Sequence, residues 1–219
     1  MKNYQITSWV HHFLEDHVQS GDICIDATMG NGNDTALLSK LVGEKGRVIA
    51  FDIQQMALDH TREKLIKESC PDNCELVLDS HEKMGQYAKE DTVSCITFNL
   101  GYLPGGDHAK ATKSDSSINA IETGLSLLKK KGLMTVCIYS GGDSGFEEKE
   151  AVLSYIKALD SKKYLVIIRG RQNMQTDAVM EQIRGGYKKV SLKSANYGLE
   201  HSELIVEISA KNDINSEVI

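Results

Sequence analysis

The sequence predicts an α/β fold in which helices cover both faces of a mainly parallel sheet, giving three layers. Two observations indicate this class. Five short apolar segments alternate with helical segments between residues 22 and 160, which is the pattern of parallel strands joined by crossover helices. A glycine-rich turn also joins the first apolar segment to a helix, as in βαβ units that bind a ligand at the carboxyl ends of their strands.

Length and composition indicate one soluble globular domain. The 219 residues are 41% hydrophobic and 26% charged, which is enough apolar material for a full core. We see no linker or repeat, and therefore expect a single domain over residues 1–210, followed by a polar tail over 211–219. No apolar run is long enough to span a membrane, and the first residues lack a signal-peptide profile. We expect a cytoplasmic protein without a membrane partner.

The five cysteines fit a reducing compartment. Cys24, Cys95 and Cys137 lie in apolar segments, where a thiol acts as a small apolar side chain. Cys70 and Cys74 lack two further ligands at matching spacing, so we expect no metal. The net charge of −6 does not favour a nucleic-acid partner, although local cations can still contact phosphates. The candidate clusters are Lys110 with Lys113, Lys129 to Lys131, Lys162 with Lys163, Arg169 with Arg171, and Arg184 with Lys188 and Lys189.

The first half of the chain has the clearer pattern. An amphipathic helix is expected over residues 4–19, with His11, His12 and His17 on the surface. Next come a strand over 22–27, a helix over 33–42 that ends near Gly43, a strand over 47–52, and a helix over 54–69 that Pro71 ends.

In the second half, strands are expected over 75–79 and 93–98. Ser114 or Asp115 can cap the next helix, and Lys129 to Lys131 would lie at its negative end before Gly132. A strand over 133–139, a helix over 146–160 and a strand over 164–168 follow. The pattern then weakens, with a helix over 176–184, a weak strand over 189–195 and a final strand over 204–208.

The segment from Asp22 to Asp52 predicts a cofactor that contains a nucleoside. Gly30 and Gly32 let the backbone approach a ligand closely. Asp52 follows Gly32 by twenty positions, where a carboxylate can accept both hydroxyls of a ribose. Two cofactor chemistries share this layout, the dinucleotides and S-adenosylmethionine.

The acidic residues favour S-adenosylmethionine. A dinucleotide site would have a third glycine where this chain has Thr35, and a helix start free of negative charge to face the pyrophosphate. Here Asp34 lies at the helix start and Asp26 ends the preceding strand. These carboxylates suit the ammonium and sulfonium of S-adenosylmethionine. A nicotinamide dinucleotide, and a βαβ unit without a ligand, are the less favoured alternatives.

The ends of the third and fourth strands face the same crevice. Asp79, Ser80 and His81 would lie near the adenine, although His81 at a helix start on the surface is an alternative. The segment Asn99 to Tyr102 retains the outer residues of the Asn/Asp-Pro-Pro-Tyr turn of methyltransferases that act on planar nitrogen. There the amide oxygen accepts from the target amine and the aromatic ring holds the base. A simple turn after a strand is the other interpretation.

Four motifs together resemble a family of bacterial methyltransferases long catalogued as rRNA methylases. They are DATMGNGNDT (26–35), FDIQ (51–54), DSH (79–81) and NLGYLPGGDH (99–108). The resemblance covers residues 3–173 and implies a Rossmann-like class I methyltransferase with a mainly parallel, seven-stranded sheet. Members of this family methylate the aminomethyl group of 5-aminomethyl-(2-thio)uridine at the tRNA wobble position. The implied partner is therefore tRNA, through its anticodon stem-loop. The sequence is compatible with a homodimer but does not decide the oligomeric state.

The resemblance implies donor contacts at Asn31, Asn33, Asp52, Gln54, Ser80 and His81, and an acceptor site from Asn99 and Tyr102 to His108. Asp107 and His108 are candidate proton acceptors or residues that only shape this loop. Tyr102 would stack on the uracil. The full set of predicted cofactor-binding residues is Asp26, Thr28, Gly30, Asn31, Gly32, Asn33, Asp34, Thr35, Asp52, Ile53, Gln54, Asp79, Ser80, His81 and Asn99.

One departure from the family concerns the C-terminal part. Relatives close the fold soon after the sixth strand with consecutive prolines, whereas this chain has no proline beyond Pro104 and carries extra residues over 174–201. A methyltransferase acting on another RNA such as rRNA, on a small molecule or on a protein therefore stays as the alternative. A nicotinamide oxidoreductase and a donor-binding module without activity are less favoured.

Overall fold

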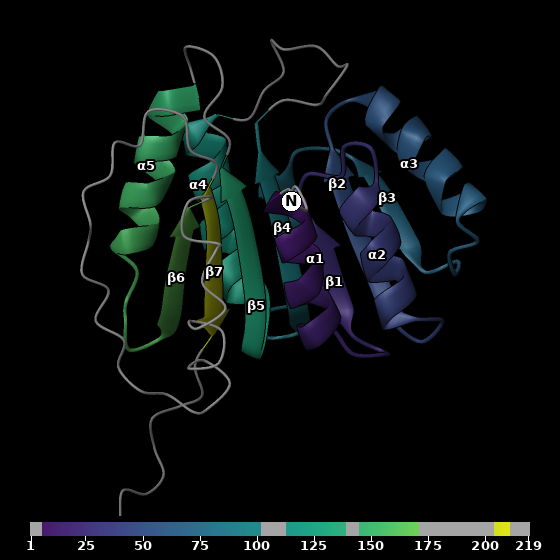
Figure 1. The fold of residues 1–219 in the computed structure, drawn as a ribbon, viewed down its shortest axis with the longest axis horizontal. Helices are drawn as coiled ribbons and strands as arrows, with labels where there is room; N and C mark the ends of the chain where they lie inside the picture. Colours follow the sequence, from purple (N-terminus) through teal and green to yellow (C-terminus); the bar gives the residue numbers. More distant parts are fainter. Residues whose placement is uncertain (1–5, 102–112, 139–144, 171–203, 211–219) are drawn as a thin grey trace, which may run out of the picture.

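The computed structural model describes residues 6–101, 113–138, 145–170 and 204–210 (Figure 1). In this part of the chain the helices are α1 (Ile6–His17), α2 (Asn33–Val42), α3 (Gln55–Lys67), the 3₁₀ helix η1 (His81–Gln86), α4 (Ser114–Leu127) and α5 (Gly145–Lys157). The strands are β1 (Ile23–Asp26), β2 (Arg47–Asp52), β3 (Cys74–Leu78), β4 (Val93–Leu100), β5 (Leu128–Ile138), β6 (Tyr164–Gly170) and β7 (Leu204–Ala210).

The strands form one sheet with the order β3-β2-β1-β4-β5-β7-β6. The first five pair in parallel, while β7 runs antiparallel to both β5 and β6. The predicted fold class, a mainly parallel Rossmann-like α/β sheet, is confirmed. The chain moves outward from β1 in one direction through β2 and β3, and in the other through β4 and β5. The crevice at this change of direction, outside the carboxyl ends of β1 and β4, is where such sheets bind ligands.

Successive residues of a strand point to opposite faces of the sheet, and this alternation explains the three layers. Ile25 of β1 packs into a cluster with buried residues of η1, α4 and α5. Its neighbour Cys24 packs into a second cluster with α1 and α2, and Ala50 of β2 lies against Leu58 of α3. Helices α1, α2 and α3 therefore cover one face, and η1, α4 and α5 cover the other (Figure 1).

Most predicted elements are confirmed within two residues at each end, and the buried positions of Cys24, Cys95 and Cys137 agree with their predicted role as apolar side chains. No helix in the ranges described above has both the length and the apolarity to cross a membrane. The predicted helix over 176–184, the predicted strand over 189–195 and the polar tail lie outside the described residues.

The predicted end of α4 is wrong. The helix stops at Leu127, and Leu128 already pairs with Val93 in the sheet, so Lys129 to Lys131 belong to β5. Lys129 Nζ lies 2.6 Å from Asp22 Oδ1, and a register shift in the β4–β5 pairing follows. The apolar spacing alone could not separate helix from strand here, because Leu128 fits both patterns. The predicted cap is also wrong: Lys113 is the N-cap and makes no side-chain capping bond.

Two further differences concern the site. Strand β4 extends to Leu100, so Asn99 lies in a strand and not in a turn after it. Residues 81–86 form η1, where a helix start at His81 was only the alternative interpretation, and the Ser80 hydroxyl accepts a hydrogen bond from the Glu82 N–H at its start. Both differences place side chains at the carboxyl edge of the sheet.

Candidate functional site

The turn between β1 and α2 lies at the change of strand direction and depends on glycine. Gly30 and Gly32 have φ angles of 52° and 73°, which side chains other than glycine rarely adopt. A Cβ at Gly32 would lie 2.7 Å from Thr61 Oγ1 of α3, too close for any contact. Thr61 in turn donates a hydrogen bond to the Gly30 carbonyl at 3.2 Å. Packing and hydrogen bonding by Thr61 of α3 therefore stabilise the conformation of this turn.

Asp52, at the end of β2, is held by the backbone. Its two oxygens accept hydrogen bonds from the Gly30 N–H at 3.0 Å and from the Gln54 N–H at 2.9 Å. Burial raises the pKa of this carboxyl, and these hydrogen bonds lower it in part. Since each carboxylate oxygen has a second lone pair, Asp52 can still accept from two hydroxyls. This geometry suits the ribose contact predicted from the spacing.

Apolar surface adjoins Asp52. Ile53 is 52% exposed and Leu78, the β3 partner of Asp52, is 50% exposed. Exposed side chains of this size at the mouth of a crevice offer a surface for a flat ring. Gln54, also predicted as a donor contact, is the N-cap of α3. Asn31, another predicted donor contact, lies with its Oδ1 3.1 Å from Nδ1 of His60 in α3.

His81 has a fixed tautomer. Its Nδ1 lies 3.1 Å from the Ala27 carbonyl oxygen, which can only accept, so Nδ1 carries the hydrogen. Burial lowers the pKa of the ring, and the neutral ring leaves Nε2 as an acceptor. The ring also meets Phe98 edge to face at 5.9 Å. His81 is the first residue of η1, as one of the two interpretations expected, and an Nε2 acceptor also suits the predicted contact with the adenine edge.

The other two residues of the predicted adenine motif are engaged locally. Asp79 forms an ion pair with Lys83 at 2.9 Å, and Ser80 caps η1. Both shape the segment that carries His81. Asn33, predicted as a donor contact, is exposed at the first position of α2.

Asp26 is buried below the turn and stabilises it through hydrogen bonds to residues on either side of it. It has no exposed surface, and it accepts hydrogen bonds from the Thr35 hydroxyl at 2.6 Å and the Thr28 N–H at 3.2 Å. Burial, together with the nearby charge of Asp34, raises the pKa of Asp26 to about 7. The charge argument made from the sequence was therefore only partly right, because Asp26 is not a full negative charge near neutral pH.

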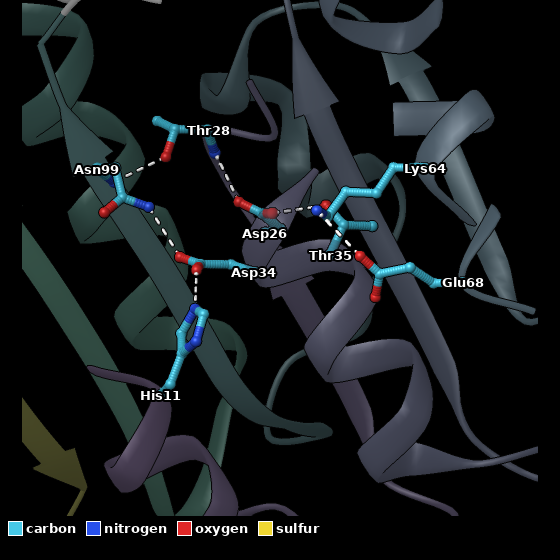
Figure 2. Close-up of polar contacts among 8 residues, drawn as sticks. All are labelled: His11, Asp26, Thr28, Asp34, Thr35, Lys64, Glu68 and Asn99. Atoms are coloured by element: carbon cyan, nitrogen blue, oxygen red, sulfur yellow. Dashed lines mark hydrogen bonds and ion pairs between the residues drawn. The ribbon is translucent and has the colours of Figure 1, made fainter. Parts of the chain in front are cut away.

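Asp34 joins two distant elements. Its Oδ1 lies 2.8 Å from Nε2 of His11 in α1, and its Oδ2 accepts from Nδ2 of Asn99 in β4 at 2.8 Å (Figure 2). The Asp34 side chain is only 6% exposed. His11, predicted as a surface residue, keeps 32% of its side chain exposed, and its ring also contacts Asp34, which the sequence did not predict. Thr28 completes the group, because its hydroxyl accepts from the Asn99 backbone N–H at 2.7 Å.

The side-chain carbonyl of Asn99 is the least satisfied group of the site. A carboxylate can only accept, so the Asn99 NH₂ must face Asp34 and the carbonyl oxygen must point elsewhere. That oxygen is buried, and within the described ranges it has no hydrogen-bond partner. Buried polar atoms without partners are uncommon and call for an explanation. A ligand N–H at this position would supply one.

Three predicted acceptor residues, Tyr102, Asp107 and His108, lie outside the described residues. Of the predicted phosphate contacts, Lys129 to Lys131 and Lys162 with Lys163 precede or begin strands β5 and β6. They therefore lie at the amino edge of the sheet, opposite the glycine turn. Lys113, at the start of α4, lies on the same side as the turn. Among the residues with described positions, no three His, Cys, Asp or Glu side chains could hold one metal ion.

Sequence reasoning missed His11, His60 and Thr61. His11 follows the buried Val10 in the amphipathic helix. No sequence pattern relates His11 to Asp34, because the two residues are 23 positions apart. Only the packing of α1 against α2 shows the contact.

Comparison with known proteins assigns the family. A family model described as "Putative rRNA methylase" matches residues 48–183. The chain belongs to this family. A tRNA (mnm(5)s(2)U34)-methyltransferase, chloroplastic, from Arabidopsis thaliana is 38% identical over 158 residues, which are 68% of this chain and 58% of that protein. This chain therefore spans less than two thirds of that curated relative.

Solved structures agree over nearly the whole chain. A crystal structure described as a "putative rRNA-methylase" from Clostridium thermocellum has a TM-score of 0.78 and 37% identity, and the match covers 96% of this chain and 100% of the other. A protein from Streptococcus mutans described as "a putative methyltransferase", solved in complex with SAH, has a TM-score of 0.72 and 32% identity, and the match covers 94% of this chain and 98% of the other. The family resemblance drawn from the four motifs is confirmed.

Proposed function

We propose that this protein is an S-adenosylmethionine-dependent N-methyltransferase that acts on tRNA. The proposed acceptor is the aminomethyl nitrogen of 5-aminomethyl-(2-thio)uridine at the wobble position. Membership of a methylase family supports the reaction class, the S. mutans neighbour in complex with SAH supports the donor, and the name of the Arabidopsis relative supports the substrate. The proposed location is the cytoplasm, which suits five free cysteines.

The observation that carries the proposal is the buried carbonyl of Asn99. It lies at the carboxyl end of β4, next to the glycine turn, and lacks a hydrogen-bond partner in the part of the chain that the structure describes. An acceptor at this point suits a nucleophile that carries N–H groups. It does not suit a carbon or thiolate nucleophile, neither of which could satisfy it.

The donor would be held by residues around the turn. Asp52 would accept the ribose hydroxyls, Ile53 would cover one side of the adenine, and His81 Nε2 would accept from the exocyclic amine. Asn31, Asn33, Thr28 and Gln54 would line the remainder of the crevice. Asp26 and Thr35 would act from beneath by keeping the turn open. Asp34 would contribute a carboxylate near the methionine end of the donor.

S-adenosylmethionine supplies a methyl group on a cationic sulfur, and loss of that methyl leaves S-adenosylhomocysteine. The chain itself has to align the amine with the methyl carbon, which can account for several kcal/mol of the barrier. Asn99 Oδ1 would accept one N–H of the amine and so direct the nitrogen lone pair away from itself. The amine must be neutral to attack, and one proton must leave the nitrogen. We propose Asp107 or His108 as the acceptor of that proton and Tyr102 as the stacking partner of the uracil.

The test is methyl transfer to a defined tRNA. The protein is incubated with S-adenosylmethionine labelled on the methyl group and tRNA carrying 5-aminomethyluridine at the wobble position. A matched tRNA with unmodified uridine at that position serves as the control. We expect label only in the first tRNA, and mass spectrometry of its nucleosides should place the methyl group on the aminomethyl nitrogen. If the donor binds and neither tRNA is labelled, the proposed substrate is wrong.

Another RNA is the second candidate, because the family model carries an rRNA methylase description. Ribosomal RNA from a strain lacking this protein can be offered in the same assay. Label in rRNA and not in tRNA would favour this candidate. A small-molecule or protein substrate would show transfer that does not depend on either RNA.

A further inference from the structure

Helix α1 places His11 at the centre of the site although it lies outside the βαβ unit. The helix is anchored by buried apolar side chains, namely Val10, Phe13, Leu14 and Val18, which pack with α2 and the sheet. His11 is on the flank of this apolar face, with 32% of its side chain exposed. Although the side chain is partly exposed, its Nε2 lies 2.8 Å from Asp34 Oδ1.

The orientation of the His11, Asp34 and Asn99 side chains follows from which of their groups donate hydrogen bonds and which accept them. Both partners of the Asp34 carboxylate must donate, so His11 presents N–H from Nε2 and Asn99 presents its NH₂. The hydrogen bond to Asp34 raises the pKa of His11, and the charge of Glu15 on α1 acts in the same direction. Burial and the charge of Lys64 on α3 oppose this rise. Figure 2 shows Asp34 between the two donors.

Loss of His11 would free one oxygen of Asp34. The terminal torsion of an aspartate is soft, so the carboxylate could rotate toward water and no longer fix the Asn99 NH₂. The Asn99 amide could then turn, which would exchange its donor and its acceptor. The Asn99 backbone would remain in β4, so the change would affect side-chain orientation and not the fold.

We propose that His11 is a positioning residue for methyl transfer: it holds Asp34, and through Asp34 it keeps the Asn99 carbonyl facing the acceptor amine. This inference rests on the proposed function, since it assigns the amine as the partner of Asn99. In this proposal helix α1 affects the part of the site that binds the methyl-accepting amine, namely Asn99. It does not contact the ribose or the adenine of the donor.

The test compares three variants. His11→Ala removes the donor. His11→Gln retains an N–H donor at a similar reach, and it carries no charge. His12→Ala is the matched control on the same helix, since His12 is exposed, forms its ion pair with Glu15 of the same helix and meets Trp9 edge to face. Each variant is measured for turnover with the modified tRNA, for donor affinity by calorimetry and for thermal unfolding.

We expect His11→Ala to lower kcat about tenfold, because misplacing a group that aligns the reacting atoms lowers the rate even when the substituted residue does not touch them, with the donor Kd within twofold of the original protein. His11→Gln should recover most of the loss, and His12→Ala should behave as the original protein. An unchanged kcat in His11→Ala would overturn the proposal. So would a loss of kcat and donor affinity in equal measure, or a failure of His11→Gln to restore activity.

A second measurement does not depend on the substrate. The side-chain NH₂ of Asn99 should give an exchange-protected pair of NMR signals, assigned by their absence in Asn99→Ala. These signals should lose protection in His11→Ala and keep it in His11→Gln. Retained protection in His11→Ala would overturn the positioning role. If instead the original protein labels no tRNA while the NMR result is as expected, the proposed function fails and the orientation of Asn99 by His11 stands.

Discussion

In the proposed function the site has two halves, a donor half around Asp52 and His81 and an acceptor half around Asn99, and the two are built differently. In the donor half, the functional side chains are held by backbone groups: Asp52 by the N–H groups of Gly30 and Gln54, and His81 by the Ala27 carbonyl. In the acceptor half, side chains hold side chains: His11 and Asn99, which lie 23 and 65 positions from Asp34, meet on its carboxylate. Backbone contacts persist after a substitution, whereas a chain of side chains does not. The acceptor half should therefore respond as a unit.

The three carboxylates near the turn, those of Asp52, Asp26 and Asp34, also differ from one another. Asp52 is half-buried and retains lone pairs on its surface side, while Asp26 is fully buried and its pKa is raised to about 7. Asp34 lies 2.8 Å from the His11 ring, and this hydrogen bond raises the pKa of His11. The three acids therefore differ in burial and in partners, and our proposal gives each a different task. The following predictions separate these tasks.

The largest effect is expected in the acceptor half. Asn99→Ala removes the carbonyl that would accept from the amine, and we expect kcat to fall about 100-fold, as for the removal of one oriented polar group that acts on the reacting atoms. The donor Kd, measured by calorimetry, should change less than threefold. Asn119→Ala, in an exposed position on α4, is the matched control. A parallel loss of kcat and donor affinity would mean that Asn99 supports the fold and has no special part in the transfer.

A substitution in the donor half should act on binding. Asp52→Asn replaces one accepting oxygen by an NH₂, which repels the Gly30 N–H or leaves a ribose hydroxyl without its acceptor. We expect the donor Kd to rise at least about tenfold, because a hydrogen bond to a charged group contributes about 1.5–3 kcal/mol. The kcat at saturating donor should stay within threefold.

The control for Asp52→Asn is Asp59→Asn on the exposed surface of α3, which should bind the donor as the original protein does. An unchanged Kd in Asp52→Asn would remove Asp52 from the donor site. A fall in kcat alone would contradict the division of the site into two halves.

The smallest effect on turnover and donor binding is expected for Asp26, whose substitution should act on stability. The folded protein keeps the Asp26 proton up to about pH 7, whereas the unfolded chain releases it near the ordinary value of 3.8. Between these values the folded state binds more protons, so the contribution of Asp26 to stability falls as the pH rises, by at most about 1.4 kcal/mol per pH unit. Asp26→Asn carries no charge. Its Oδ1 can still accept from the Thr28 N–H, while its NH₂ can donate to the Thr35 hydroxyl oxygen, so the second hydrogen bond is kept with its direction reversed.

We therefore expect the free energy of unfolding of Asp26→Asn, measured in urea, to exceed that of the original protein most clearly at pH 8 and least at pH 4. Titrating groups that do not interact with Asp26 cancel in this difference. Donor affinity should change little, since Asp26 has no exposed surface. If Asp26→Asn were less stable at pH 8 than at pH 4 relative to the original protein, Asp26 would be ionised in the folded state.

The sequence by itself determined the sheet and the donor half. Alternating apolar strands and helices, the glycines of the turn and the carboxylate at the end of β2 are local features, because each depends on the chain within one βαβ unit. The sequence placed Asn99 near the carboxyl end of the fourth strand but in a turn after it, and the structure extends the strand through this residue. The sequence did not separate the end of α4 from the start of β5, since Leu128 fits both a helix face and a strand.

Only the tertiary structure decided the charge state of Asp26, the tautomer of His81 and the contact of His11 with Asp34. A pKa depends on burial and on neighbouring charges, and a hydrogen bond between residues 23 positions apart depends on how two helices pack. Neither quantity has a local signature in the chain. The packing of α1 against α2 therefore converts a histidine with no distinguishing pattern into the residue that sets the orientation of the acceptor amide in our proposal.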